Sequence, residues 1–315
     1  MIRRYPRIRQ HDAYGNQLLR EGLILCFFVQ RPHGEIAQAV ERALDIYLDA
    51  IEPGKLGWYL DLLEDYDPEE YKGVETVMRP LDGRGWAMVR DKLRDPTHCM
   101  LQLEEHESQV GGFRFEYYGR QRGTFEHPLW RNAVSALSFW LPTEYLESHG
   151  PSRVRELAVA LARELPFNSG YVSLAFNYLD RFKEVVQTVH EQCFRYPGMD
   201  VHDLSHTSME IGTSVRGTYW MNFYGQPLLE QLGGANALRQ QLDLPEISID
   251  ELGEEKLLVA LGEWPETGDV EQQSEMRPYR VLARVLEPYL YEEHTLDWFD
   301  FSSEQLRSWR RRFLS

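Results

Sequence analysis

Apolar residues in this chain alternate between short continuous runs and helically spaced positions. The continuous runs are too short for helices and predict buried strands. Each run is followed by apolar residues at helical spacing, then by a proline turn and a strand that begins with glycine and an aromatic residue. The two series are 23–29, 35–48 and 57–60, and 136–141, 152–165 and 170–176. They predict two similar strand–helix–strand lobes related by a weak internal duplication, although any strand–helix–strand unit gives the same pattern.

Other segments complete the prediction. Alternating residues at 100–103 and 112–118 predict a hairpin, and 180–193 predicts a helix. Ser152 is the expected N-cap of the second lobe's helix, and the polar stretch 200–208 is expected to be irregular. The remaining predictions are strands at 218–224, 247–249 and 257–260, a helix at 277–290 interrupted by Pro288, and an amphipathic tail at 297–315.

These elements predict an α+β fold packed as one body, with mixed or antiparallel sheets and helices on one face. No low-complexity linker divides the chain, and the boundary is expected near Gly123–Arg131. The expected organisation is an N-terminal extension at 1–20, a first lobe at 21–130 and a second lobe at 131–315. The second lobe contains an acidic insertion at 243–275 and the amphipathic C-terminal tail.

The net charge of −16 argues against direct binding of nucleic acid, which requires a basic face. The acidic residues are concentrated in two places. Residues 61–70 hold six acids and no base, and residues 243–275 hold eleven acids and one lysine. Both segments could be solvated loops or helix faces. Alternatively, one of them docks onto a positively charged partner, whose association it would accelerate.

The cysteines and the apolar segments indicate in which cellular compartment the protein is expected. Cys26, Cys99 and Cys193 are far apart in the sequence and odd in number, which suits a reducing compartment rather than a disulfide framework. The apolar run 23–29 is too short for a membrane span and wrongly placed for a signal peptide. We therefore expect a cytoplasmic protein without membrane contact.

Few residues suggest catalysis. His202 and His206 have the i, i+4 spacing of two zinc ligands on a helix, but the glutamate that a metalloprotease needs is missing. A metal-dependent enzyme that uses these histidines stays an alternative. Cysteine–histidine pairs lack an orienting group, and no glycine-rich segment matches a nucleotide fingerprint. We expect no catalytic residues, no metal and no cofactor.

The stretch 217–238 is the most distinctive in the chain. An aromatic strand is followed by glycine, a proline-started helix and a Gly-Gly cap. With three further segments it resembles the type VI secretion immunity family (TsiV-like), over roughly residues 21–290. The motifs are Trp220, Asn222, Phe223, Gly225, Pro227, Leu228, Leu229, Leu232, Gly233, Gly234 and Leu238; Phe139–Pro142 with Glu144, Gly150 and Leu165-Pro166; Ser169–Val172 with Ala175-Phe176; and Pro197–Val201.

The resemblance implies an immunity protein, or antitoxin, that binds a cognate type VI effector without catalysing a reaction. Relatives are paired with nuclease toxins, so we expect a 1:1 complex in which an acidic segment covers the basic substrate groove. An adaptor that loads the effector for export is the other alternative. Trp58, Tyr66 or Trp264 would supply aromatic anchors. The expected toxin-binding residues are Asp61, Glu64, Asp65, Tyr66, Asp67, Glu69, Glu70, Glu263, Trp264, Glu266, Asp269 and Glu271.

Overall fold

A single twelve-stranded sheet organises the protein. The structure is a computed structural model and describes residues 4–62, 76–107, 110–121, 131–253, 255–291 and 301–314. Along the sheet the strands follow the order β11-β12-β10-β8-β2-β7-β6-β5-β3-β4, with β1 added on β2 and β9 on β8. All pairings are antiparallel except the parallel pair β8–β9. The bounds are β1 Gln10–His11, β2 Gln17–Val29, β3 Trp58–Leu62, β4 Thr76–Pro80, β5 Cys99–Glu104, β6 Arg114–Gly119, β7 Ser135–Pro142, β8 Ser169–Tyr178, β9 Met199–Val201, β10 Met221–Tyr224, β11 Ile247–Glu251 and β12 Leu257–Leu261.

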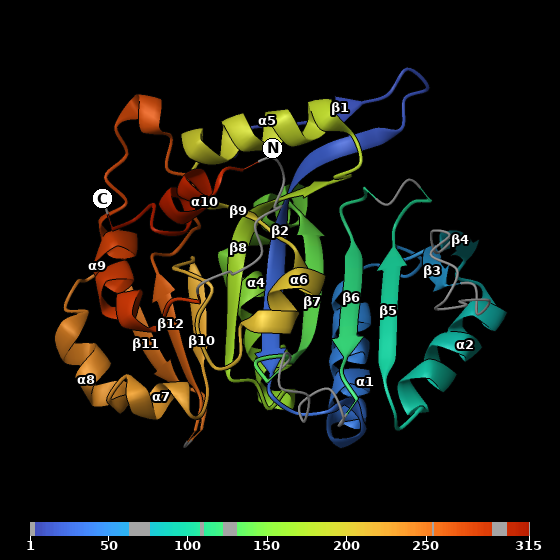
Figure 1. The fold of residues 1–315 in the computed structure, drawn as a ribbon, viewed down its shortest axis with the longest axis horizontal. Coiled ribbons are helices and arrows are strands. Elements are labelled where there is room, and N and C mark those ends of the chain that lie inside the picture. The colour runs from blue at the N-terminus through green and yellow to red at the C-terminus, as the bar shows by residue number, and fades with distance from the viewer. Residues whose placement is uncertain are drawn as a thin grey trace.

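Helices pack against this sheet and lie beside its two edges (Figure 1). Their bounds are α1 His33–Ala50, α2 Gly83–Arg94, α4 Thr143–Glu164, α5 Lys183–Arg195, α6 Leu204–Glu210, α7 Leu228–Gln231, α8 Gly234–Gln241, α9 Arg277–Leu286 and α10 Ser303–Arg310, with single 3-10 turns η2 Val270–Gln272 and η3 Glu287–Tyr289. The helices α1 and α4 pack against each other behind the central strands, and α6 lies in front of them (Figure 1). Helices therefore cover parts of both faces of the sheet, whereas the sequence predicts them on one face.

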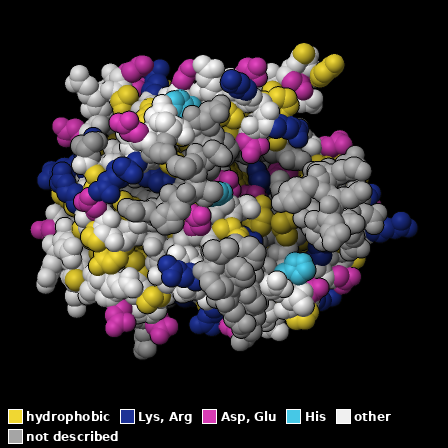
Figure 2. All heavy atoms as spheres, in the orientation of Figure 1, with side chains coloured by type: hydrophobic (Ala, Val, Ile, Leu, Met, Phe, Trp, Pro, Cys, Tyr) yellow, Lys and Arg dark blue, Asp and Glu magenta, His cyan; other side chains and the backbone are white. Residues whose placement is uncertain are grey.

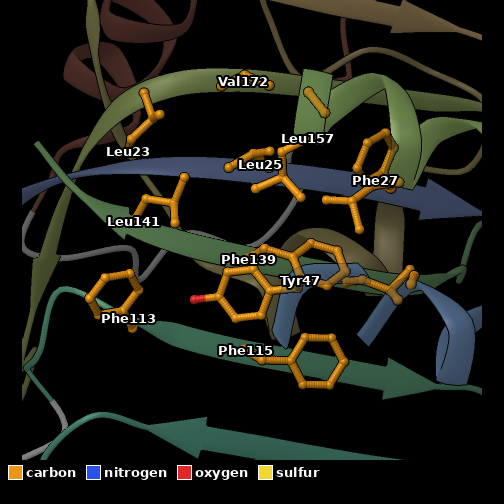
Figure 3. Close-up of a cluster of buried hydrophobic side chains, with 14 of the residues drawn as sticks. Leu23, Leu25, Phe27, Tyr47, Phe113, Phe115, Phe139, Leu141, Leu157 and Val172 are labelled. Carbon is orange, nitrogen blue, oxygen red and sulfur yellow. The ribbon is translucent and has the colours of Figure 1, made fainter. Parts of the chain in front are cut away.

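The main core lies between the central strands and the helices α1 and α4. Alternate residues of β2 point to this side, where Leu25 and Phe27 are fully buried. They meet Tyr47 of α1, Leu157 of α4 and Phe139 of β7 in one cluster (Figure 3). Because both faces of β2 are covered, its sequence is a continuous apolar run and not an alternating one.

The opposite face of the same strands forms a separate, smaller core. Ile24, Cys26 and Phe28 of β2 lie there, packed with Leu204 of α6 and Tyr171 of β8. This face continues across β5 and β6 as polar side chains, which are described below. The two faces thus differ in chemistry, with one aliphatic and aromatic and the other partly charged.

The predicted α+β class and the packing as one body are confirmed, but the internal duplication is not. The strands β2 and β7 are adjacent and α1 packs on α4. However, β8 pairs directly with β2, whereas β3 pairs with β4 and β5 near the far edge. The two strand–helix–strand series therefore occupy inequivalent places in the sheet, despite their similar patterns.

Two local predictions are wrong. The second long helix begins at Thr143 and not at Ser152, and it is kinked where Gly150 has a φ of 81°. Pro151 follows this glycine, and its fixed φ suits the first position of the renewed helix. The polar stretch 200–208 is regular, because it contains the end of β9 and most of α6, which Asp203 caps through the His206 amide.

The glycines and proline of the family-like stretch have structural explanations. Gly225 lies so close to the Phe167 carbonyl that a Cβ would stand 2.0 Å from its oxygen. Pro227 precedes the short helix α7, and Gly233 takes the left-handed conformation with a φ of 81°. The stretch therefore builds a turn and a helix cap, and its aromatic residues belong to the core.

Candidate functional site

The first predicted acidic segment begins in β3. Asp61 Oδ2 lies 2.7 Å from Arg79 Nε, and its other oxygen is 4.0 Å from Lys92 Nζ. Its charge is thus offset by two cations on neighbouring elements. The rest of this set, Glu64, Asp65, Tyr66, Asp67, Glu69 and Glu70, lies outside the described residues.

The second predicted acidic segment, 243–275, contains β11 and β12 and most of the loop that follows β12. This loop, residues 262–276, is called here the acidic loop. It packs beside α5, where Arg195 holds two of its carboxylates. Arg195 Nη2 is 3.2 Å from Asp269 and 2.7 Å from Glu271. Asp269 also caps η2 by accepting a hydrogen bond from the Glu271 amide. These two acids therefore fix the loop to α5, and part of their charge is neutralised within the chain.

Glu263 and Glu266 differ from that pair, because both are exposed and neither forms an ion pair with the part of the chain that the structure describes. Partial burial, and secondarily the negative charge of Glu246, raise the pKa of Glu266. The carboxylates of Glu246 and Glu266 therefore lie close enough to repel each other. The loop thus presents uncompensated negative charge at Glu263 and Glu266.

Trp264 stands between these two glutamates and faces a hollow. The guanidinium of Arg4 lies 4.1 Å from the centre of its ring, in cation–π geometry. The hollow has a volume of about 680 Å³ and is also lined by Tyr5, Tyr196 and Glu266. Aromatic side chains from three distant parts of the chain therefore line the same hollow as acidic residues of the loop.

Close packing at Gly198 positions the acidic loop. The Gly198 amide donates to the Thr267 carbonyl at 2.8 Å, and a Cβ on Gly198 would stand 1.9 Å from the Glu266 carbonyl oxygen. The backbone of the loop thus lies directly against the turn between α5 and β9. Only glycine permits this approach without a shift of the loop.

Gly198→Ala is expected to displace the acidic loop and to destabilise the fold by about 1–3 kcal/mol, because a methyl group would overlap a backbone oxygen. Urea unfolding measures the loss, and limited proteolysis detects a loosened loop. Gly83→Ala is the control for a lost glycine, since nothing lies within 4 Å of the Cβ there and Gly83 does not take the left-handed conformation. Unchanged stability and unchanged cleavage in Gly198→Ala would contradict this packing role.

The predicted histidine pair is not arranged as an exposed metal site. His202 is buried, with its Nδ1 2.9 Å from the Tyr171 hydroxyl, and burial holds its pKa well below the usual range. His206 lies in the first turn of α6. Within the described ranges, no three His, Cys, Asp or Glu side chains come together as metal ligands. The structure thus gives the metalloenzyme alternative no support.

A buried ion pair lies beside His202, which sequence reasoning did not find. Arg216 Nη1 is 2.6 Å and 2.5 Å from the two carboxylate oxygens of Asp200, and its Nη2 donates to the Val201 carbonyl. Tyr171 donates to Asp200, and the Tyr219 hydroxyl accepts from Arg216. This network joins β8, β9 and the segment before β10, so its role is structural.

A second buried cluster lies on the polar face of β5 and β6. Arg114 stands between two carboxylates, 3.0 Å from Glu104 and 2.5 Å from Glu116. Gln102 also donates to Glu104, and Ser138 to Glu116. Burial raises the pKa of Glu104 to about 8, because one guanidinium cannot compensate two buried carboxylates. Alternation at period two predicted the strands, but it did not indicate this charge cluster.

The surface is not uniformly acidic. Arginines gather over α9 and α10, where Figure 2 shows a group of basic side chains. On α9, Arg277, Arg280 and Arg284 follow the i, i+3, i+7 spacing of one helix face. The net charge therefore does not indicate which exposed acids could meet a partner, and the positions of Glu263 and Glu266, which form no ion pair with the described residues, are more informative.

Comparisons with known proteins identify a family and a similar fold. The model of a family described as TsiV, type VI immunity for VRR-NUC, matches residues 39–313. Among solved structures, the Pseudomonas aeruginosa T6SS protein PA0821 is similar with a TM-score of 0.73 and 19% identity, over 97% of this chain and 87% of that one. At such identity the likeness concerns the fold alone. No curated protein matches.

Proposed function

This chain belongs to the TsiV family of type VI immunity proteins, and we propose that it neutralises a cognate nuclease effector by binding it 1:1. In this proposal an acidic surface of the chain covers the substrate groove of the nuclease, and the chain itself catalyses nothing. The family description names VRR-NUC, which supports a nuclease as the target. The predicted adaptor role has no observation in its favour.

The observation that supports the acidic mechanism is the exposed pair Glu263 and Glu266 beside the hollow at Trp264. A nuclease groove is basic because it holds phosphates, so carboxylates on a rigid loop complement its potential. An aromatic side chain among them supplies the apolar contact that usually dominates affinity. Asp269 and Glu271 would contribute by fixing the loop, since both are paired with Arg195.

We place the protein in the cytoplasm. The three cysteines are free and buried, as suits a reducing compartment. In the described part of the chain, no helix is both long and apolar enough to cross a membrane. An effector that attacks nucleic acid has its substrate in the same compartment.

The first test is association of the purified chain with the nuclease encoded beside it. A stable 1:1 complex at physiological salt, with loss of nuclease activity, is the expected result. If the two proteins do not associate, or if the complex retains full activity, the proposed function is wrong. Size-exclusion chromatography with light scattering gives the stoichiometry, and cleavage of a labelled duplex gives the activity.

Glu263→Lys with Glu266→Lys is expected to slow association with the effector about tenfold to a hundredfold at low salt, with a smaller effect at high salt, because steering is screened. Stopped-flow mixing at two ionic strengths measures the on-rate. Asp49→Lys with Asp91→Lys makes the same change in net charge at exposed positions on α1 and α2. Equal slowing in both double variants would show that net charge alone acts, and would remove the acidic loop from the interface.

A further inference from the structure

The hollow beside Trp264 already holds a cationic side chain of the chain itself. Arg4 belongs to the segment that leads into β1, and its guanidinium lies 4.1 Å from the centre of the Trp264 ring. Arg4 is exposed, so the contact is made at the surface and is accessible to exchange. The pairing shows that the geometry of this ring accommodates a guanidinium.

The backbone next to Arg4 is held independently of this contact. Glu147 of α4 accepts hydrogen bonds from the backbone amides of Arg4 and Tyr5, and it also forms an ion pair with Arg7 at 2.5 Å. Tyr5 is buried, with 6% of its surface exposed. The segment would therefore keep its place if the Arg4 side chain moved off Trp264.

The walls of the hollow have the chemistry of a cation receptor. Two aromatic side chains besides Trp264, those of Tyr5 and Tyr196, lie around it. Glu263 and Glu266 stand on either side of Trp264 in sequence and also line the hollow. A ring face with flanking carboxylates attracts a guanidinium by its quadrupole and by charge.

Every other charged group at the hollow can be named. Asp269 lines it but is engaged by Arg195, which also binds Glu271. Arg4 is the only cation among its described lining residues. Glu263 and Glu266, both exposed, are the other acids that line the hollow. The hollow is also larger than one guanidinium needs, because about 680 Å³ is within the roughly 300–1,000 Å³ of ligand sites.

We propose that this hollow is the receptor for an arginine side chain of the protein partner, and that Arg4 occupies the ring face until the partner displaces it. This deepens the proposed function, because it names the chemistry of the partner group that enters the acidic surface. A basic nuclease groove carries such arginines for its phosphates. Binding then exchanges the Arg4 guanidinium for that of the partner. Because one contact replaces another, the net affinity comes from the further contacts that the partner makes.

The receptor can be tested without the effector. With 5-fluorotryptophan in the protein, Trp264→Phe identifies the fluorine resonance of Trp264 among the eight tryptophans. Arg4→Ala is expected to shift that resonance, and N-acetyl-arginine amide is expected to shift it back toward the wild-type position. The isosteric N-acetyl-citrulline amide, which has no charge, should leave it unchanged. Equal responses to both amides, or none to the arginine derivative, would overturn the receptor.

The matching experiment uses the effector. Arg4→Ala is expected to tighten the complex a few-fold, because the competing side chain is gone, whereas Trp264→Ala should weaken it about tenfold. Arg84→Ala, at an exposed position on α2, is the control for a lost arginine. If wild type binds the effector but both Arg4→Ala and Trp264→Ala bind as wild type does, the receptor role is wrong and the immunity function stands. Failure of wild type itself to bind refutes the proposed function instead.

Discussion

Arg216→Met is expected to lower the free energy of unfolding by about 3–5 kcal/mol, because it leaves Asp200 as a buried charge without its cation. The Asp200 side chain has no exposed surface, and that of Arg216 is 1% exposed. Both carboxylate oxygens of Asp200 lie within 2.6 Å of the guanidinium. The Tyr171 hydroxyl can still donate to Asp200, but it cannot supply a positive charge. Urea unfolding followed by tryptophan fluorescence measures the loss.

Two further variants separate charge burial from other causes. Arg239→Met removes an exposed pair with Glu251, with about half of each side chain in solvent, so its cost is expected to stay within about 1 kcal/mol. The double variant Asp200→Leu with Arg216→Met removes both buried charges and should recover part of the stability lost in Arg216→Met. A cost below about 1 kcal/mol for Arg216→Met would contradict the assigned role of this network.

The sequence predicts much of the fold because buried positions carry apolar residues at a spacing that differs between strands and helices. The run at 23–29 is apolar throughout, and both faces of β2 are covered. The helical spacing at 35–48 corresponds to α1, and the alternation at 100–103 and 112–118 corresponds to the antiparallel pair β5–β6. Strand order is not contained in such patterns, which is why two similar series suggested a duplication that the sheet does not confirm.

The site was harder to predict because its contacts join distant parts of the sequence. Arg4 meets Trp264 across almost the whole chain, and no local spacing reveals that pairing. The acidic composition indicated the loop, but it did not show that an arginine neutralises some of its carboxylates. Asp269 and Glu271 look equivalent to Glu263 in sequence, yet only the first two pair with Arg195. Tertiary contacts therefore determine which carboxylates are left unpaired and could bind a partner.

These contacts also relate stability to recognition. The acidic loop is fixed by Arg195 on one side and by Gly198 beneath it, so Glu263 and Glu266 project from a rigid support. In the proposed complex, a preorganised acidic surface would lose little conformational entropy on binding. Asp200 follows Gly198 by two residues in the same segment, and its buried pair with Arg216 holds β9 in place. In the proposed complex, the buried charges would act only through the support they give this loop.

Raising the pH from 5 to 8 is expected to destabilise the protein through Glu104, by about 3–4 kcal/mol. Burial raises the pKa of this carboxyl from 4.5 to about 8. The folded state therefore keeps a proton that the unfolded state releases above pH 4.5. The stability contributed by that proton is fully present below the unfolded pKa and is lost as the pH rises through the folded pKa. Urea unfolding at pH steps between 5 and 8.5 measures this slope.

Glu104→Gln isolates the contribution, because its side chain is neutral at every pH and still accepts a hydrogen bond. The variant should lose most of the slope and become more stable than wild type near pH 8.5. Glu116→Gln should also reduce the slope, but by another route. Glu104 is then the single carboxylate paired with Arg114, so its pKa in the folded state falls and it ionises more easily. Parallel stability curves for wild type and Glu104→Gln would show that Glu104 is ionised in the folded protein. In that case Arg114 compensates both carboxylates despite their burial.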